Sequence, residues 1–104
     1  MDARDAQVLE GLRRAGSKLD QPHSLLHYVY VPAKEKAETV GRQLKKDGLT
    51  VEVRQAAMGT DWLVLARHQV VPTDSQIAKL RALFEAVAKE AGGEYDGWEA
   101  GVRK

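Results

Sequence analysis

Three histidines are the residues best suited to catalysis or metal binding, because the chain contains no cysteine. They are His23, His27 and His68. A metal site on one helix needs ligands about one turn apart, on the same face. His23 and His27 are four positions apart, but they flank a transition from loop to strand. We interpret them as one surface histidine and one strand histidine, so no metal site is expected.

No other pattern indicates catalysis. The chain lacks a Gly-x-Ser-x-Gly elbow, a phosphate-binding glycine loop and a dinucleotide fingerprint. Gly92 and Gly93 end a helical stretch, whereas phosphate binding needs the start of a helix. Glu94 and Asp96 would share one face of a strand, where two solvated carboxylates are the ordinary interpretation. We therefore expect no catalytic residue and no cofactor, and we predict that the protein is not an enzyme.

Length and charge limit the classes of function that the protein could have. The 104 residues fit one domain, residues 1–104. Sixteen basic and fifteen acidic residues give a net charge of +1, which argues against a strongly electrostatic nucleic-acid binder. No apolar run approaches the ~20 residues that span a bilayer, and none follows Met1 as in a signal peptide. Together with the absence of cysteine, this leads us to expect a cytoplasmic protein without membrane contact.

Hydrophobic periodicity divides the chain into seven elements. Apolar residues at helical spacing predict helices over about 2–15, 34–47 and 73–91, the last one begun by a capping box of Thr73 and Gln76. Strands are predicted over 25–31, 49–55, 62–66 and 94–102. The strands 25–31 and 62–66 show no alternation, which is typical of central strands covered on both faces or nearly so. The strand 49–55 alternates and carries charges outward, as an edge strand does.

The order of these elements is one helix followed by β-α-β-β-α-β. It predicts an α+β ferredoxin-like plait over residues 25–102, with a four-stranded antiparallel sheet and two helices on one face. Residues 1–16 would add an extra N-terminal helix. The plait places its first and third strands in the centre, in agreement with their lack of alternation.

Such a sheet leaves its second face open. Tyr28 and Tyr30 alternate with His27, Val29 and Val31, and we expect the valine face to lie under the helices. The tyrosines would then lie on the open face. We hypothesise that the N-terminal helix covers part of that face with its apolar stripe.

Aromatic residues on the central strands suggest an alternative. The common RNA-recognition module has the same plait and stacks bases on such residues. Tyr28, Tyr30 and Trp62 offer aromatic rings here, but the aromatic octamer of the module's third strand is missing. A small RNA-binding domain thus stays an alternative, and tyrosines packed beneath the N-terminal helix are favoured.

The run from Glu94 to Trp98 needs its own explanation. Tyr95 and Trp98 bracket Asp96-Gly97, a turn or bulge pair within a predicted strand. The structural interpretation is that the two rings seal the sheet edge around a bulge at Gly97.

This run, with Ala91-Gly92-Gly93 before it, resembles the C-terminal motif of the ribonuclease E inhibitor family, also called regulator of ribonuclease activity B. Further segments are similar to that family's pattern, so the resemblance covers roughly residues 25–102. They are residues 27–32, 48–53 and 62–66, which read HYVYVP, GLTVEV and WLVLA.

The resemblance implies a ferredoxin-like domain that binds a protein partner. Characterised members bind endoribonuclease E and reduce RNA cleavage without being enzymes. The inhibitory members are strongly acidic and have an acidic C-terminal extension, whereas this nearly neutral chain reads Val102-Arg103-Lys104 at its end. We expect a protein-interaction module, monomeric or weakly dimeric, whose partner is an endoribonuclease or another protein. Its candidate partner-binding residues are Tyr28, Tyr30, Trp62, Tyr95, Asp96 and Trp98.

Overall fold

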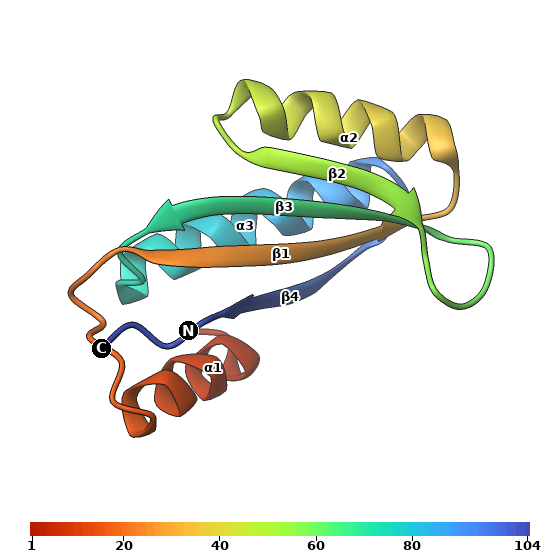
Figure 1. Ribbon diagram of the computed structural model, residues 1–104. Coiled ribbons are helices and arrows are strands. Elements are labelled where there is room, and N and C mark those ends of the chain that lie inside the picture. The colour runs from red at the N-terminus through yellow and green to blue at the C-terminus, as the bar shows by residue number, and fades with distance from the viewer.

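A computed structural model describes all residues, 1–104, as three helices and one four-stranded sheet (Figure 1). The strands lie in the order β2-β3-β1-β4, and every neighbouring pair is antiparallel. The predicted plait with an N-terminal helix is therefore confirmed, with β1 and β3 in the centre. The elements are α1 (Ala3–Arg14), β1 (His23–Val31), α2 (Lys34–Lys46), β2 (Thr50–Gln55), β3 (Trp62–Val70), α3 (Asp74–Glu90) and β4 (Glu94–Ala100).

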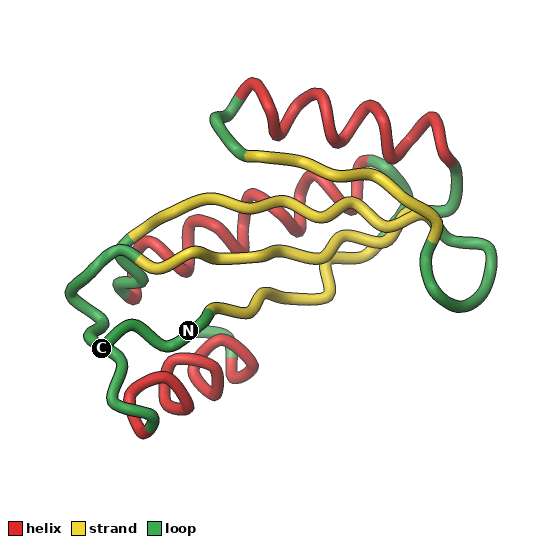
Figure 2. Tube along the Cα trace, viewed as in Figure 1, coloured by secondary structure: helices red, strands yellow, loops and turns green.

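The two central strands are longer than their sequence pattern indicated. β1 begins at His23 and β3 continues to Val70, because these two residues pair with each other at the end of the shared ladder. Backbone pairing thus extends beyond the apolar segments that identified the strands. Figure 2 shows the long strands in yellow and the loop between β2 and β3, residues 56–61, projecting from one end of the sheet.

Local signals at the helix ends agree with the structure. The Thr73 hydroxyl accepts a hydrogen bond from the Gln76 backbone N–H at 3.2 Å, which caps the first turn of α3. Gly48 follows α2 with φ +93°, a left-handed conformation that glycine adopts without strain. None of the three helices has the length and apolar content needed to cross a membrane.

The main core lies between the sheet and the two crossover helices. Val29 of β1 and Val64 of β3 are fully buried there against Leu44 of α2 and Phe84 of α3. Figure 1 shows α2 and α3 on one face of the sheet. Along β1, buried residues alternate with partly exposed ones, so the predicted valine face is the helix-covered face. The expectation that β1 is covered on both faces is wrong, because its even-numbered residues have no helix above them.

The helix α1 does not cover the open face of the sheet, and our hypothesis that it does is wrong. It lies beside the edge strand β4, and its Leu9 and Leu12 join the same core as the helix-covered face (Figure 1). The reason is the position of Trp98, which pairs with His27 and so points into the helix layer. α1 extends that layer past the sheet edge and leaves the tyrosine face uncovered.

Two glycines shape the connection into β4. Gly97 has φ +92°, and the β1–β4 register shifts between His27 and Val29, so the predicted bulge at this glycine is confirmed. Gly93 lies directly against the Tyr30 backbone carbonyl, and any Cβ at this position would overlap the oxygen. The end of α3 therefore approaches β1 more closely than any side chain would permit.

Candidate protein-interaction surface

The uncovered sheet face presents a small apolar surface on the two central strands. Tyr30 lies opposite Leu63 and Tyr28 opposite Leu65, so these four side chains share the face with Leu26. The tyrosines and Leu26 are partly exposed, whereas Leu63 and Leu65 are buried between their neighbours. We call these five residues the open-face patch: Leu26, Tyr28, Tyr30, Leu63 and Leu65.

Charged side chains border the open-face patch, and the β4 side is acidic. Glu94 lies opposite Tyr30 and Glu99 opposite Leu26, and both carboxylates are exposed. The Tyr28 hydroxyl donates a hydrogen bond to Glu99, and this bond raises the pKa of Tyr28 above its usual value. Asp96 is also exposed, at the bulge. The patch thus has an apolar centre and one negatively charged border.

Trp62 does not belong to this surface. It pairs with Val31, whose side chain is buried under the helices, so the indole also points to the helix-covered side. The Lys34 ammonium lies 5.6 Å from the centre of the Trp62 ring, a cation–π contact. The alternative of an aromatic platform across both central strands is therefore not supported, because strand register places the tyrosines and Trp62 on opposite faces.

Burial also removes Tyr95 and Trp98 from the candidate partner surface. Each is only 7% exposed, and both point into the helix layer. The Tyr95 ring stacks on Phe84 with centroids 5.0 Å apart, and the Trp98 indole N–H donates to Asp5 at 3.0 Å. Tyr95 and Trp98 are therefore structural residues that seal the sheet edge, as the structural interpretation of this run predicted. Of the three candidate partner-binding residues in the run, only Asp96 is exposed.

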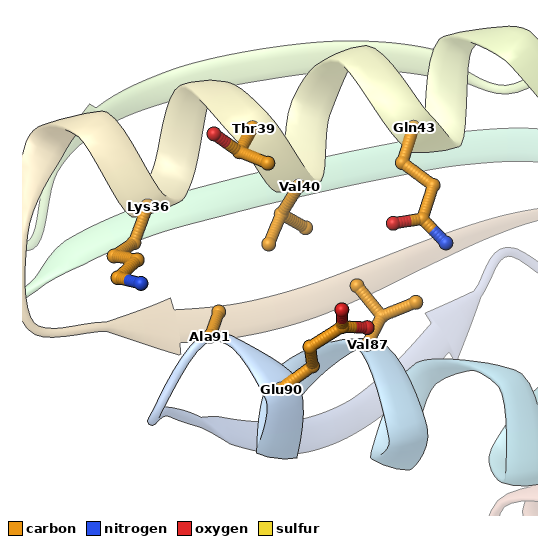
Figure 3. Close-up of a pocket in the computed structure, with 7 residues that line it drawn as sticks. All are labelled: Lys36, Thr39, Val40, Gln43, Val87, Glu90 and Ala91. Carbon is orange, nitrogen blue, oxygen red and sulfur yellow. The ribbon is translucent and has the colours of Figure 1, made fainter.

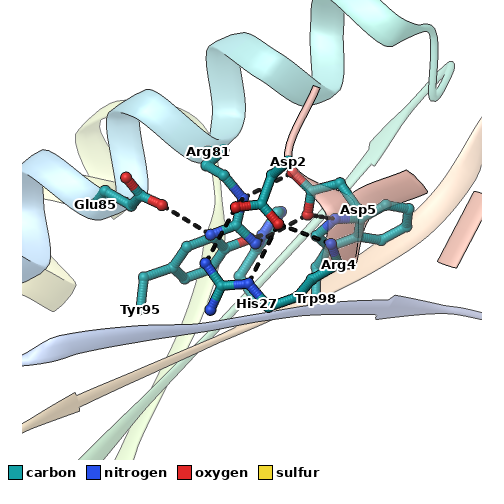
Figure 4. A network of polar contacts seen from close by, with 8 residues as sticks. All are labelled: Asp2, Arg4, Asp5, His27, Arg81, Glu85, Tyr95 and Trp98. Atoms are coloured by element: carbon teal, nitrogen blue, oxygen red, sulfur yellow. Dashed lines mark hydrogen bonds and ion pairs between the residues drawn. The ribbon is translucent and has the colours of Figure 1, made fainter. Parts of the chain in front are cut away.

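A buried ion pair connects α1 to the rest of the fold (Figure 4). Two guanidinium nitrogens of Arg81 donate to the Asp5 carboxylate, at 2.7 and 2.9 Å, and a third nitrogen donates to Glu85 at 2.8 Å. Asp5 is 2% exposed and Arg81 8%. The hydrogen bonds to Asp5 raise the pKa of Arg81 further above its usual value. The Arg81 side chain also lies over the Tyr95 ring, so it holds α1, α3 and β4 together.

Sequence reasoning missed a second buried polar group, centred on His27. This imidazole is fully buried and stacks on Phe84 at 4.1 Å. Its Nδ1 lies 2.8 Å from the Tyr95 hydroxyl and its Nε2 lies 2.9 Å from Nε2 of His68. Burial, with a smaller effect of His68, lowers the pKa of His27 to about 3. Burial likewise raises the pKa of Tyr95 and lowers that of His68.

The histidines bond to other parts of the fold. His23, expected at the surface, is 1% exposed and bonds to the Ser17 hydroxyl and the Gln21 carbonyl. No three or more metal-ligating side chains gather anywhere in the chain. The Nε2 atoms of His27 and His68 bond to each other, and Nδ1 of His27 lies against Tyr95.

A small cleft lies between α2 and α3. It has a volume of about 190 Å³, and Figure 3 shows Val40 and Val87 facing each other across it. Lys36 and Glu90 are its charged lining residues. The Thr39 hydroxyl in its lining donates to the Glu35 backbone carbonyl at 3.0 Å.

Comparison with known proteins supports one family. The model of a family described as regulator of ribonuclease activity B matches residues 2–100. A search of curated proteins found no match. The matched region contains all three helices and all four strands.

Proposed function

The chain belongs to the regulator of ribonuclease activity B family, and from this premise we propose that it binds an endoribonuclease and modulates RNA decay without catalysing a reaction itself. The family match over residues 2–100 is the observation that carries this proposal. We infer that the partner is an endoribonuclease of the E type. We also propose that the protein acts in the cytoplasm, as a monomer or a weak dimer.

The open-face patch is the best candidate for the contact surface. A plait covers one sheet face with helices, and α1 adds to that same layer, so Tyr28 and Tyr30 stay accessible. Tyrosine is enriched at protein interfaces because it gives a large contact area with little conformational entropy to lose. A partner that buries the two rings would also cover Leu26, which is partly exposed between them and the end of the sheet.

The acidic border predicts the character of the partner surface. Glu94, Asp96 and Glu99 follow one side of the patch, so a partner with lysine or arginine beside an apolar residue would match it. The same carboxylates disfavour RNA on this face, because they would repel its phosphates. Because Trp62 is not on this face, the third strand offers no aromatic ring on which an RNA base could stack there.

The test uses purified full-length chain, purified endoribonuclease E and a labelled RNA substrate. We expect the wild-type chain to bind the nuclease and lower the rate of RNA cleavage. The double variant Tyr28→Ala/Tyr30→Ala should lose both effects. A matched control, Lys36→Ala/Gln43→Ala at the mouth of the cleft between α2 and α3, should keep them.

Two results would overturn parts of the proposal. If the wild-type chain neither binds the nuclease nor alters cleavage, the partner assignment is wrong. If the tyrosine variant binds and inhibits like the wild type, the partner contacts another surface. Direct binding of the RNA by the chain alone would replace protein contact with RNA contact as the mechanism.

A further inference from the structure

The outer edge of β2 carries backbone groups without a partner strand. β2 is at the end of the sheet opposite β4, and it pairs with β3 alone. The Ala56 N–H donates to the Asp61 carbonyl where the β2–β3 hairpin closes, and the ladder continues without a register shift. Inward and outward hydrogen-bonding groups alternate in an antiparallel pair. Val51, Val53 and Gln55 therefore direct their N–H and C=O groups outward.

A groove follows this free edge on its α2 side. Its volume is about 300 Å³, and its apolar lining is Val51 and Val53 with Gly41 of α2 opposite. Both valines are partly exposed. A Cβ on Gly41 would lie 3.2 Å and 3.3 Å from their methyl groups, so the glycine lets helix and strand approach closely.

The border of the groove is predominantly basic. Arg42 and Lys45 project from α2 beside it, and Glu38 is the only acidic residue that lines it. Both basic residues are exposed, and neither forms an ion pair. Two cations without a carboxylate partner favour an anionic ligand at this position.

We propose that the β2 edge and its groove bind an extended acidic peptide segment of a protein partner. The segment pairs with the outward backbone groups of Val51 and Val53 and becomes a fifth strand, as in β-strand addition. The side chains at alternate positions of the segment point toward α2. Small apolar ones among them pack on Val51 and Val53, and carboxylates among them reach Arg42 and Lys45. This surface is separate from the open-face patch, and the proposal does not depend on a ribonuclease as the partner.

An acidic peptide fits this edge better than a second copy of the chain. Two copies joined through β2 would bring two sets of Arg42 and Lys45 to the same side of the combined sheet. Like charges placed together in this way are unfavourable. A peptide with carboxylates neutralises one set and leaves no such repulsion.

Fluorescence anisotropy with a labelled eight-residue peptide, Thr-Val-Thr-Glu-Thr-Val-Thr-Glu, tests the proposal, because its valines and glutamates share one face of the added strand. We expect the wild-type chain to bind it at low salt and not to bind the matched peptide with lysine in place of glutamate. The variant Arg42→Glu/Lys45→Glu should bind the acidic peptide about tenfold more weakly or worse, a loss of about 1.4 kcal/mol. Tyr28→Ala/Tyr30→Ala is the control for the other surface and should bind like the wild type.

Val53→Pro tests the backbone contact separately. It removes an outward N–H that makes no bond to β3, a position where edge strands accept proline. We expect peptide binding to fall by a similar factor while thermal unfolding stays cooperative. If this variant fails to fold, the charge-reversed variant alone decides.

The proposal is overturned if the wild type does not bind the acidic peptide, or if charge reversal leaves its affinity unchanged. Sedimentation of the chain without peptide gives a further test. A dimer that the acidic peptide does not dissociate, and that Arg42→Glu/Lys45→Glu leaves intact, would assign the edge to a second copy instead. If the chain sediments as a monomer, a second copy does not occupy the edge, and the edge is free for a peptide.

Discussion

The Nε2 atoms of His27 and His68 lie 2.9 Å apart across β1 and β3. At this distance one nitrogen must donate its proton and the other must accept it, so at most one of the two can carry a proton there. The Tyr95 hydroxyl lies 2.8 Å from the other ring nitrogen of His27. Protonation of both imidazoles would place two N–H donors against each other in the core.

This pair predicts loss of stability in mild acid. The pKa of His27 is lowered from 6.5 to about 3, so the unfolded chain binds more protons than the folded chain between these values. Stability is therefore complete above pH 6.5 and falls as the pH drops toward 3. We expect the free energy of unfolding in urea to decrease by up to about 1.4 kcal/mol per pH unit for His27. His27→Gln should reduce the slope between pH 7 and 5, and an unchanged slope would contradict this assignment.

The ion pair of Asp5 with Arg81 predicts that removing one partner destabilises the fold far more than replacing both. Asp5→Ala leaves the buried guanidinium short of its main partner, and we expect a loss of about 3–5 kcal/mol in the free energy of unfolding. Asp5→Leu/Arg81→Met removes both charges and should recover most of this loss. Glu10→Ala, which breaks only exposed ion pairs in α1, is the control and should change little. Equal effects of the single and double variants would refute the role of the unpaired charge.

Two glycine-to-alanine changes should act in opposite directions. Gly93→Ala places a methyl group on the Tyr30 carbonyl, so β1 and the end of α3 must separate. We expect it to lower the free energy of unfolding by about 3 kcal/mol, the upper range for an overpacked site. Gly11→Ala meets open space in the middle of α1 and should raise stability by up to about 1 kcal/mol. Thermal unfolding followed by circular dichroism compares them, and a neutral Gly93→Ala would show that the contact can relax.

Removal of the side-chain hydroxyl should lower the free energy of unfolding at Tyr95 and change it little at Tyr28. Tyr95→Phe leaves Nδ1 of the buried His27 without a partner, which costs about 1–3 kcal/mol. Tyr28→Phe removes a hydrogen bond on the solvent-accessible face, and a change within about 0.5 kcal/mol is expected. Urea unfolding of both variants at pH 7.5 measures the difference. A larger loss for Tyr28→Phe than for Tyr95→Phe would contradict the assignment of the two faces.

The order of the elements predicted the plait, and the two-residue period of side chains along a strand predicted the two faces of β1. The even positions Tyr28 and Tyr30 had to share a face, because successive side chains point to opposite sides of a strand. The same rule applies within β3, but the pairing of β1 with β3 is not visible in either segment. It is this register that places Trp62 opposite Val31 and turns it away from the tyrosines.

The buried polar residues were harder to predict, because each depends on a partner distant in sequence. His27 and His68 are 41 positions apart, and only the register brings them together. Asp5 did leave a signal, since it is on the same helical stripe as Leu9 and Leu12. A carboxylate at a core position indicates a buried cationic partner, and Arg81 on the apolar face of α3 is that partner.

The central position of β1 also has a consequence for the newly made chain. His27 is synthesised before both of its hydrogen-bonding partners, His68 and Tyr95, and Tyr95 follows it by 68 positions. While synthesis proceeds from the N-terminus, β1 emerges first with neither neighbouring strand available, and its apolar side chains stay unprotected. We therefore expect no stable folding intermediate on the ribosome: the domain should fold only after β4 has left the exit tunnel, in a single cooperative step.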